Sequence, residues 1–126
     1  MLALSFMNAI ADSVSLTLAC HPENPSRAIQ GIEVVVGTGP GYILTLAFAL
    51  EGDIASLRIP EHGPSRRAGG LWRHTCFEVF AMPEGGPGYR EFNFSPSGEW
   101  AAYAFRGYRE GGEPGVEFNP GIVVRK

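Results

Sequence analysis

Segments in which apolar and polar residues alternate run along most of the chain, and clusters of glycine and proline separate them. Alternation with a period of two is the pattern of a β-strand with one buried face. It predicts strands at Ser15–Cys20, Ile32–Val36, Tyr42–Glu51, Leu57–Ile59, His74–Met82, Tyr89–Phe94, Glu99–Arg106, Val116–Phe118 and Ile122–Val124. No stretch of ten or more residues has the period of an amphipathic helix. The pattern therefore predicts an all-β fold, an antiparallel β-sandwich.

Two turn segments indicate how these strands pair. Gly37–Gly41 resembles a phosphate-binding loop only superficially, because such a loop opens a helix, whereas here a strand follows and Pro40 lacks an N–H. We therefore predict a hairpin loop. Ser95–Gly98 has Pro at its second position and Gly at its fourth, which suits a type I turn. The strands between residues 74 and 106 then form an antiparallel meander. In the predicted strand Tyr42–Glu51, alternate residues share one face, namely Tyr42, Leu44, Leu46, Phe48 and Leu50.

Composition and charge narrow the classes of function. The 126 residues fit one domain, and 17 Gly with 10 Pro suit many short strands. The 13 acidic residues outnumber the 10 basic ones, and the resulting net charge of −3 gives no general attraction to nucleic acid. No apolar run approaches the roughly 18 residues of a membrane helix. We therefore expect neither a nucleic-acid nor a membrane partner.

The N-terminal segment is apolar and ends in Ala9-Ile10-Ala11, a pattern similar to a signal-peptide cleavage site. A secretory signal also needs a basic segment at its start, and the first cation of this chain is Arg27. We therefore treat residues 1–14 as an N-terminal extension and residues 15–126 as the domain. The expected location is cytoplasmic, with secretion or the periplasm as the alternative.

The two cysteines, Cys20 and Cys76, do not form a C-x-x-C pair, so neither a zinc knuckle nor a thioredoxin-type motif is present. Whether they pair with each other stays open. His74, Cys76 and Glu78 share one face of a predicted strand, and such a set can bind a metal or pair a thiol with a base. Phe80 on the same face instead suggests burial, which makes Cys76 a small buried apolar residue. We predict neither a metal site nor an enzyme.

Three glutamates, Glu78, Glu91 and Glu99, lie on successive strands of the meander. Two of them can converge as a glycosidase pair, one can bind a sugar hydroxyl, or all can lie on a solvated strand face. Trp72 stands where a flexible loop meets a strand, so it either packs in the core or offers its ring to a pyranose. Trp100, followed by two alanines, is predicted to be structural.

The stretches Leu71–Phe80 and Tyr89–Tyr108 resemble DOMON-like domains related to family-nine carbohydrate-binding modules, in a bacterial branch. The matching pattern is Leu-Trp-x-x-x-Cys-x-Glu-x-Phe, followed by Tyr-x-Glu-Phe-x-x-x-Pro-x-Gly. Leu16–Pro22 and Leu57–Pro60 are also similar, and the resemblance covers roughly residues 15–110. It implies an immunoglobulin-like or jelly-roll β-sandwich.

The resemblance also implies a function and a set of site residues. In the carbohydrate-binding members, a Trp and a Glu six residues later contact a terminal sugar, and Trp72 and Glu78 have this spacing. We therefore expect a non-catalytic module that binds a small saccharide. Trp72 would stack on the sugar, Glu78 and Arg90 would hydrogen-bond to it, and Asn93 and His74 would add polar contacts.

The sequence departs from the family near its C-terminus. Members of the family supply a second aromatic residue there, and no candidate follows Phe118. We expect a sandwich that is incomplete at its C-terminus, with an exposed sheet edge that can form a homodimer. No cofactor is expected. The alternatives are calcium, a haem-binding DOMON module with Met82 and either His74 or His62 as axial ligands, and a sandwich that serves only protein contact.

Overall fold

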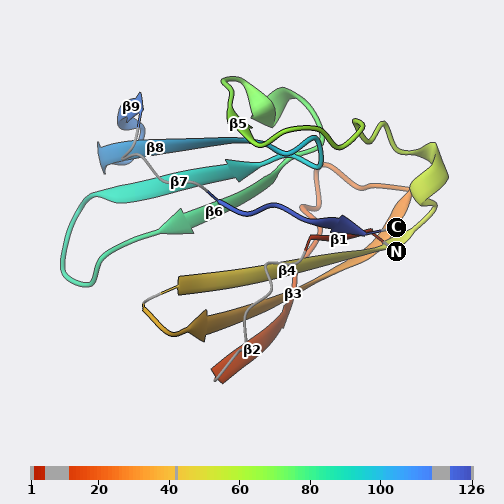
Figure 1. The fold of residues 1–126 in the computed structure, drawn as a ribbon, viewed down its shortest axis with the longest axis horizontal. Helices are drawn as coiled ribbons and strands as arrows, with labels where there is room; N and C mark the ends of the chain where they lie inside the picture. The colour runs from red at the N-terminus through yellow and green to blue at the C-terminus, as the bar shows by residue number, and fades with distance from the viewer. Residues whose placement is uncertain (1, 5–11, 42, 115–119, 126) are drawn as a thin grey trace. The chain divides into compact units, whose positions relative to one another are not determined.

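The computed structural model describes residues 2–4, 12–41, 43–114 and 120–125 (Figure 1). The chain divides into two compact units. The first comprises residues 1–58 and 122–126, and the second comprises residues 59–121. Each contains one β-sheet, and most strand pairs are antiparallel. The predicted all-β class with antiparallel sheets is therefore confirmed. Among the described residues, no helix has the length and apolar character that crossing a membrane would require.

The first unit holds a sheet in which all neighbouring strands are antiparallel, in the order β10-β1-β4-β3-β2. Its elements are β1 (Leu2–Leu4), β2 (Asp12–Thr17), β3 (Ile29–Gly39), β4 (Ile43–Gly52), the 3₁₀ turn η1 (Ile54–Ser56) and β10 (Val124–Arg125). The two longest strands, β3 and β4, form the predicted hairpin, in which Gly39 faces Ile43. The hairpin therefore includes the glycine-rich segment that superficially resembled a phosphate loop.

One face of β3 and β4 forms the core of this sheet. Val34 lies opposite Phe48, and both are buried. Leu46 and Leu50 are buried beside them, as the shared face predicted. Leu44, on the same face, is 51% exposed, and Tyr42 lies outside the described residues.

The end of β4 depends on a glycine. Gly52 has a φ of 145°, and a Cβ atom there would lie 2.0 Å from the carbonyl oxygen of Ala28. The next residue, Asp53, donates its N–H to the same oxygen at 2.8 Å. The close backbone approach therefore requires a residue without a side chain.

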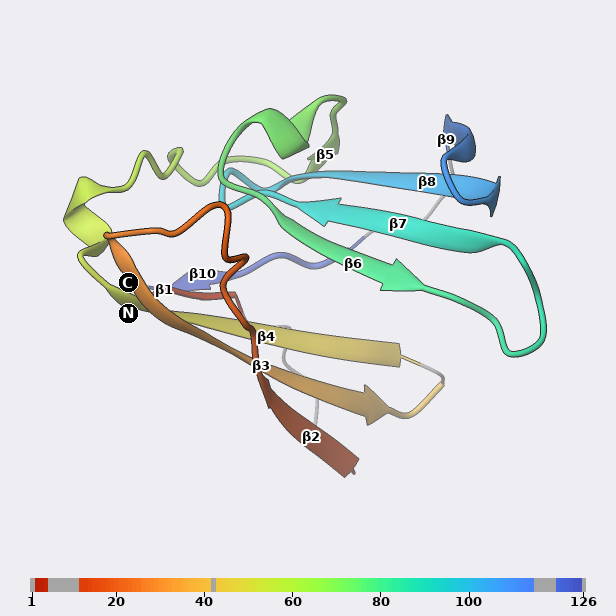
Figure 2. The ribbon, with the colours of Figure 1, turned by 180° about the vertical axis from the view of Figure 1, so that it is seen from behind.

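The second unit holds a sheet in the order β5-β8-β7-β6, with β9 also paired to β8 (Figure 2). Its elements are β5 (Arg66–Arg67), the 3₁₀ turn η2 (Leu71–Arg73), β6 (Phe77–Ala81), β7 (Tyr89–Phe94), β8 (Glu99–Gly107) and β9 (Glu110–Pro114). The predicted antiparallel meander of β6, β7 and β8 is confirmed. The short β5 pairs parallel to β8.

Side chains of the meander alternate between its two faces, and the register of the strands makes these faces different in composition. On one face Phe77, Phe94 and Trp100 lie in a row across the three strands, and each is less than 8% exposed. Ala102, 3% exposed, lies on the same face one row away. This apolar face confirms the structural role predicted for Trp100. The opposite face carries carboxylates, phenols and aromatic rings.

The turn between β7 and β8 is held by a segment from the loop before β5. Gly98 donates its N–H to the Ser95 carbonyl at 3.0 Å, which closes the predicted four-residue turn. Gly63 donates its N–H to the Ser97 carbonyl at 2.8 Å. Gly98 has a φ of 92°, and a Cβ atom there would lie 2.6 Å from the Gly63 carbonyl oxygen. Left-handed backbone and close approach together require glycine at this position.

The structure differs from the sequence prediction at several strand boundaries. Leu57–Ile59, predicted as a strand, forms none, and η1 precedes it instead. β6 begins at Phe77 rather than His74, because His74 donates its N–H to the Leu71 carbonyl at the end of η2. Residues 2–4 and 12–14, predicted as an N-terminal extension, pair within the first sheet. Residues 116–118 lie outside the described residues.

Candidate functional site

The structure brings together only some of the residues predicted to bind a sugar. Glu78 on β6 lies directly opposite Asn93 on β7, so both side chains project from the same face. Arg90 is three residues before Asn93 on the same strand, and an odd spacing places it on the other face. This corrects the expectation that Arg90 and Glu78 contact one sugar.

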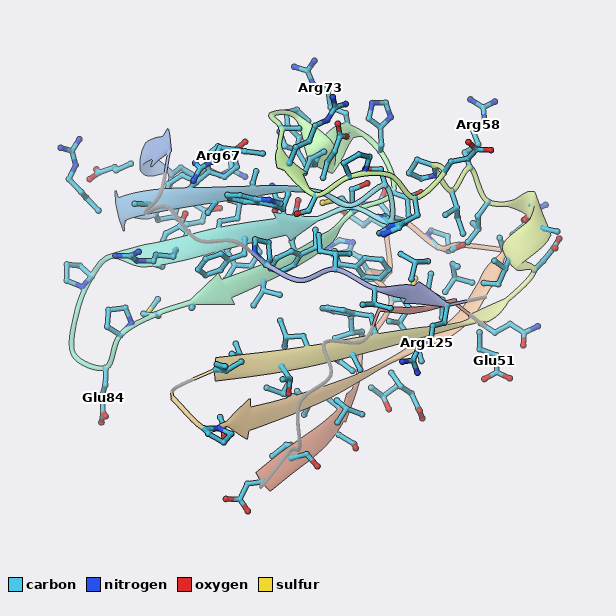
Figure 3. All side chains as sticks on the ribbon, in the orientation of Figure 1. Glu51, Arg58, Arg67, Arg73, Glu84 and Arg125 are labelled. Atoms are coloured by element: carbon cyan, nitrogen blue, oxygen red, sulfur yellow. The ribbon has the colours of Figure 1, made fainter. Side chains whose placement is uncertain are left out.

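Trp72 and His74 lie outside the strands, at η2. Leu71 is buried and anchors η2, which lies against β7 and β8, while Trp72 is 58% exposed. The guanidinium carbon of Arg73 lies 5.0 Å from the centroid of the Trp72 ring, and Figure 3 places Arg73 on η2. His74, directly after η2, is also exposed. Trp72 therefore does not pack in the core, and its predicted contact with a sugar stays a prediction.

The face of the meander that bears Glu78 has an ordered arrangement, which we call the carboxylate face. Its residues are Glu78, Phe80, Tyr89, Glu91, Asn93, Ala101, Tyr103 and Phe105. Read across the strands, one row holds Glu78, Asn93 and Ala101. The next row holds Phe80, Glu91 and Tyr103, and the third pairs Tyr89 with Phe105. Glu91 therefore lies between two aromatic residues, diagonal to Glu78.

Three aromatic rings run across this face, one from each strand. Tyr89 and Phe105 stack at a centroid distance of 4.7 Å and an interplanar angle of 10°. The Phe80 ring lies 6.1 Å from the Tyr89 ring at an angle of 54°, and Phe80 is 58% exposed. The expectation that Phe80 marks burial is therefore wrong. Tyr89 is also held by its hydroxyl, which accepts the Arg109 N–H at 3.4 Å.

Asn93 lies opposite Glu78 and forms a hydrogen bond with Glu91. Asn93 is fully buried, and its Nδ2 donates to Glu91 Oε1 at 3.1 Å. Its Oδ1 is buried and has no hydrogen-bond partner among the described residues. Burial raises the pKa of Glu78, and the nearby negative charge of Glu91 raises it further. Asn93 therefore orients Glu91 from the neighbouring row, and its own Oδ1 has no donor among the described residues.

Glu99, the third glutamate considered, does not belong to this pair. Arg66 on β5 donates to Glu99 Oε1 from Nε at 2.8 Å and from Nη2 at 2.6 Å. Ser97 Oγ lies 3.3 Å from the other carboxylate oxygen. The charge of Glu99 is therefore compensated within the protein, whereas Glu78 and Glu91 face one another's charge.

Cys76 precedes β6 and is partly buried. Burial and, after it, the charge of Glu78 raise its pKa to about 11, so the thiol stays protonated near neutral pH. A nucleophilic or metal-binding cysteine needs the opposite shift. Among the described residues, no three His, Cys, Asp or Glu side chains gather in a way that could hold a metal ion.

The residues considered for haem do not fit that group. His74 and Met82 lie beyond opposite ends of β6, and a strand of five residues spans about 13 Å. That separation is too large for axial ligands of one iron. His62 Nδ1 lies 3.0 Å from the Pro96 carbonyl oxygen, in the segment that holds the β7–β8 turn.

Sequence reasoning misses most of the carboxylate face. It identifies Glu91 only as one of three strand glutamates, and it assigns no role to Tyr89, Tyr103 or Phe105. A signal is present, because Tyr89 and Glu91 are two residues apart, as are Tyr103 and Phe105. The missing information is the register that aligns these pairs with Phe80 and Glu78.

Comparison with known proteins gives no support from relatives, because no family model matches the chain and no curated protein or solved structure is significantly similar. The resemblance to DOMON-like domains stays a prediction. The proposed function therefore rests on the carboxylate face and on Trp72.

Proposed function

We propose that this protein is a non-catalytic carbohydrate-binding module whose ligand lies on the carboxylate face. The observation that carries the proposal is the row in which Glu91 lies between Phe80 and Tyr103. Pyranose rings bind through C–H groups that stack on aromatic faces and hydroxyls that donate to carboxylates. The carboxylate face offers both kinds of contact within neighbouring rows of one sheet.

The residues of the face divide these roles. Phe80, the most exposed ring of the row, is the stacking surface, and Tyr89 and Phe105 extend it across the sheet. Glu91 accepts hydroxyl hydrogen bonds in an orientation fixed by Asn93. This fixed orientation lowers the entropy lost on binding.

Trp72 offers a second exposed ring, on η2. Figure 3 places η2, marked by Arg73, toward one end of the meander, and the β6–β7 loop, marked by Glu84, at the other. A saccharide longer than one unit would run from the aromatic row toward Trp72. The role predicted for Trp72 is therefore kept, and that of Arg90 is dropped.

The module is proposed to bind without catalysis because its side chains stand on the surface of a sheet. A glycosidase holds its scissile bond between two carboxyl groups on opposite sides. Glu78 and Glu91 instead lie side by side on one face. We expect no hydrolysis of nitrophenyl glycosides, and measurable turnover that Glu91→Gln abolishes would contradict this part of the proposal.

Titration with glucose, cellobiose and xylose, followed by ¹H–¹⁵N chemical shifts, tests the proposal. Phe80→Ala should weaken binding by about tenfold at most, the typical worth of one aromatic contact. Arg90→Ala is the matched control, because Arg90 is exposed on the opposite face of the same strands. The proposal fails if no sugar gives a saturable shift, or if Phe80→Ala binds as the unmodified protein does.

A second candidate function, self-association, rests on strand β2. It is the last strand of its sheet, and Val14 and Leu16 on it are 60% and 50% exposed. An edge strand with exposed apolar side chains can pair with a second copy of itself. Light scattering should then give a dimer that Leu16→Lys dissociates, and a monomer at all concentrations would rule this candidate out.

A further inference from the structure

We propose that the carboxylate face prefers a protonated amino sugar, a glycan that carries a primary ammonium group, to the corresponding neutral sugar. This inference rests on the proposed carbohydrate-binding function and specifies its ligand. It stands on the charge distribution of the face, which a neutral sugar leaves uncompensated.

The two carboxylates of the face have no internal counter-ion among the described residues. Glu78 and Glu91 lie diagonally across β6 and β7, and the described residues give neither of them a salt-bridge partner. The salt bridge seen on this sheet joins Arg66 to Glu99 at 2.6 Å. Because Arg66 is paired with Glu99, its positive charge does not compensate Glu78 or Glu91.

The other described side chains of this face do not supply a cation either. Tyr89 and Tyr103 contribute phenols from β7 and β8, and Asn93 contributes an amide. Cys76, before β6, holds a neutral thiol. Arg73 lies over the Trp72 ring on η2, and His74 follows it. At the far end of the face, Arg109 donates its backbone N–H to the Tyr89 hydroxyl, and its guanidinium lies over the Tyr108 ring.

Repulsion between the two carboxylates favours the binding of a cation between them. Two neighbouring carboxylates repel each other, and the raised pKa of Glu78 reports that repulsion together with partial burial. A ligand cation placed between the two groups replaces repulsion with two attractions. It also faces the Phe80 and Tyr103 rings that flank Glu91, and aromatic faces attract cations.

The hydrogen-bonding groups of the face also favour an ammonium group. An ammonium group has three donors and no acceptor, so it needs a site that consists of acceptors. Glu78 and Glu91 provide carboxylate oxygens, which only accept hydrogen bonds when ionised. Asn93, fully buried beside them, uses its Nδ2 to hold Glu91. The set matches an ammonium better than a hydroxyl, which also needs donors.

A matched pair of ligands tests the inference. Cellobiose and the disaccharide of glucosamine differ chiefly in the ammonium groups, and both are titrated calorimetrically at pH 6 and low salt. We expect the amino sugar to bind about 5- to 30-fold more tightly, the usual range for a charge-assisted contact. Salt should reduce this ratio by screening the charges. N-acetylation of the amino sugar should abolish it.

Variants locate the effect. Glu78→Gln and Glu91→Gln should each reduce the preference, and in the double variant cellobiose and the amino sugar should bind with equal affinity. Glu84→Gln is the control, because Glu84 is an exposed carboxylate in the β6–β7 loop (Figure 3). Thermal unfolding of each variant shows that it is folded.

The outcomes separate this inference from the proposed function. Equal binding of both sugars would overturn the preference and leave a neutral carbohydrate-binding module. Binding of neither sugar would overturn both. A preference that persists in the double glutamine variant would overturn the assignment to Glu78 and Glu91.

Discussion

Replacement of Asn93 by aspartate tests the central contact of the carboxylate face. The two side chains have the same shape, but Asn93→Asp exchanges the donor that holds Glu91 Oε1 at 3.1 Å for a carboxylate oxygen. Asn93 is fully buried, so water cannot screen the new charge. An ionised aspartate at this position would therefore face Glu91 at close range, with Glu78 directly opposite.

The loss of stability depends on whether the introduced aspartate stays ionised or becomes protonated in the folded protein. Two unit charges about 3 Å apart repel by about 5 kcal/mol at an effective dielectric constant of about 20. Protonation of the introduced aspartate avoids this repulsion, and for a carboxyl with an ordinary pKa of about 3.9 it costs about 4 kcal/mol at pH 7. Protonation costs less free energy than the repulsion, and the protonated acid can donate a hydrogen bond to Glu91 as the amide does. The loss of stability is therefore about 4 kcal/mol at pH 7.

The pH dependence carries the diagnostic sign. The pKa of the introduced carboxyl is raised in the folded state, so its penalty is absent below the unfolded value and grows as pH rises. Urea unfolding of Asn93→Asp and the unmodified protein should differ by about 4 kcal/mol at pH 7 and by about 1.5 kcal/mol at pH 5. Asn24→Asp, at an exposed position, should show no such slope. A loss that is the same at every pH would refute the contact between Asn93 and Glu91.

Three further predictions test other parts of the second unit. Gly98→Ala should lower the stability by about 1–3 kcal/mol in thermal unfolding, because its φ is 92° and the new Cβ would lie 2.6 Å from the Gly63 carbonyl oxygen; an unchanged melting temperature would contradict the turn geometry. Glu78→Gln should stabilise the protein at pH 7 but not at pH 4, since the raised pKa of Glu78 makes its ionised form destabilising above the ordinary value of 4.5; urea unfolding at both pH values measures this, and a pH-independent effect would count against it. With a pKa of about 11, Cys76 is a thiolate in only about one molecule in 10,000 at pH 7, so iodoacetamide followed by mass spectrometry should label the exposed Cys20 at least about tenfold faster; equal rates would refute the burial of Cys76.

The long strands could be predicted from sequence because their evidence is local. β3, β4, β7 and β8 combine alternation with glycine- or proline-containing turns, and those signals lie within about ten residues. β5 could not be predicted, because a strand of two arginines has no period. It exists through its pairing with Glu99 and Trp100, more than thirty residues away.

The candidate site was predictable to a smaller extent. Glu78 and Asn93 could be identified singly, and their contact depends on the register of β6 against β7. The opposite placement of Arg90 was available from sequence, since three residues along a strand always change the face. The exposure of Trp72 was not available, because it depends on η2 folding as a 3₁₀ turn with Leu71 buried.

The two faces of the meander differ in what they contribute to stability. The apolar face buries Phe77, Phe94 and Trp100, and this burial stabilises the meander. On the other face, Glu78 and Glu91 repel each other and Asn93 Oδ1 stays without a partner among the described residues, and both features cost folding free energy. Apolar residues, or a single charged residue, at these positions would make the folded protein more stable. A cost of this kind, concentrated beside exposed aromatic rings, is typical of a surface selected for its ligand.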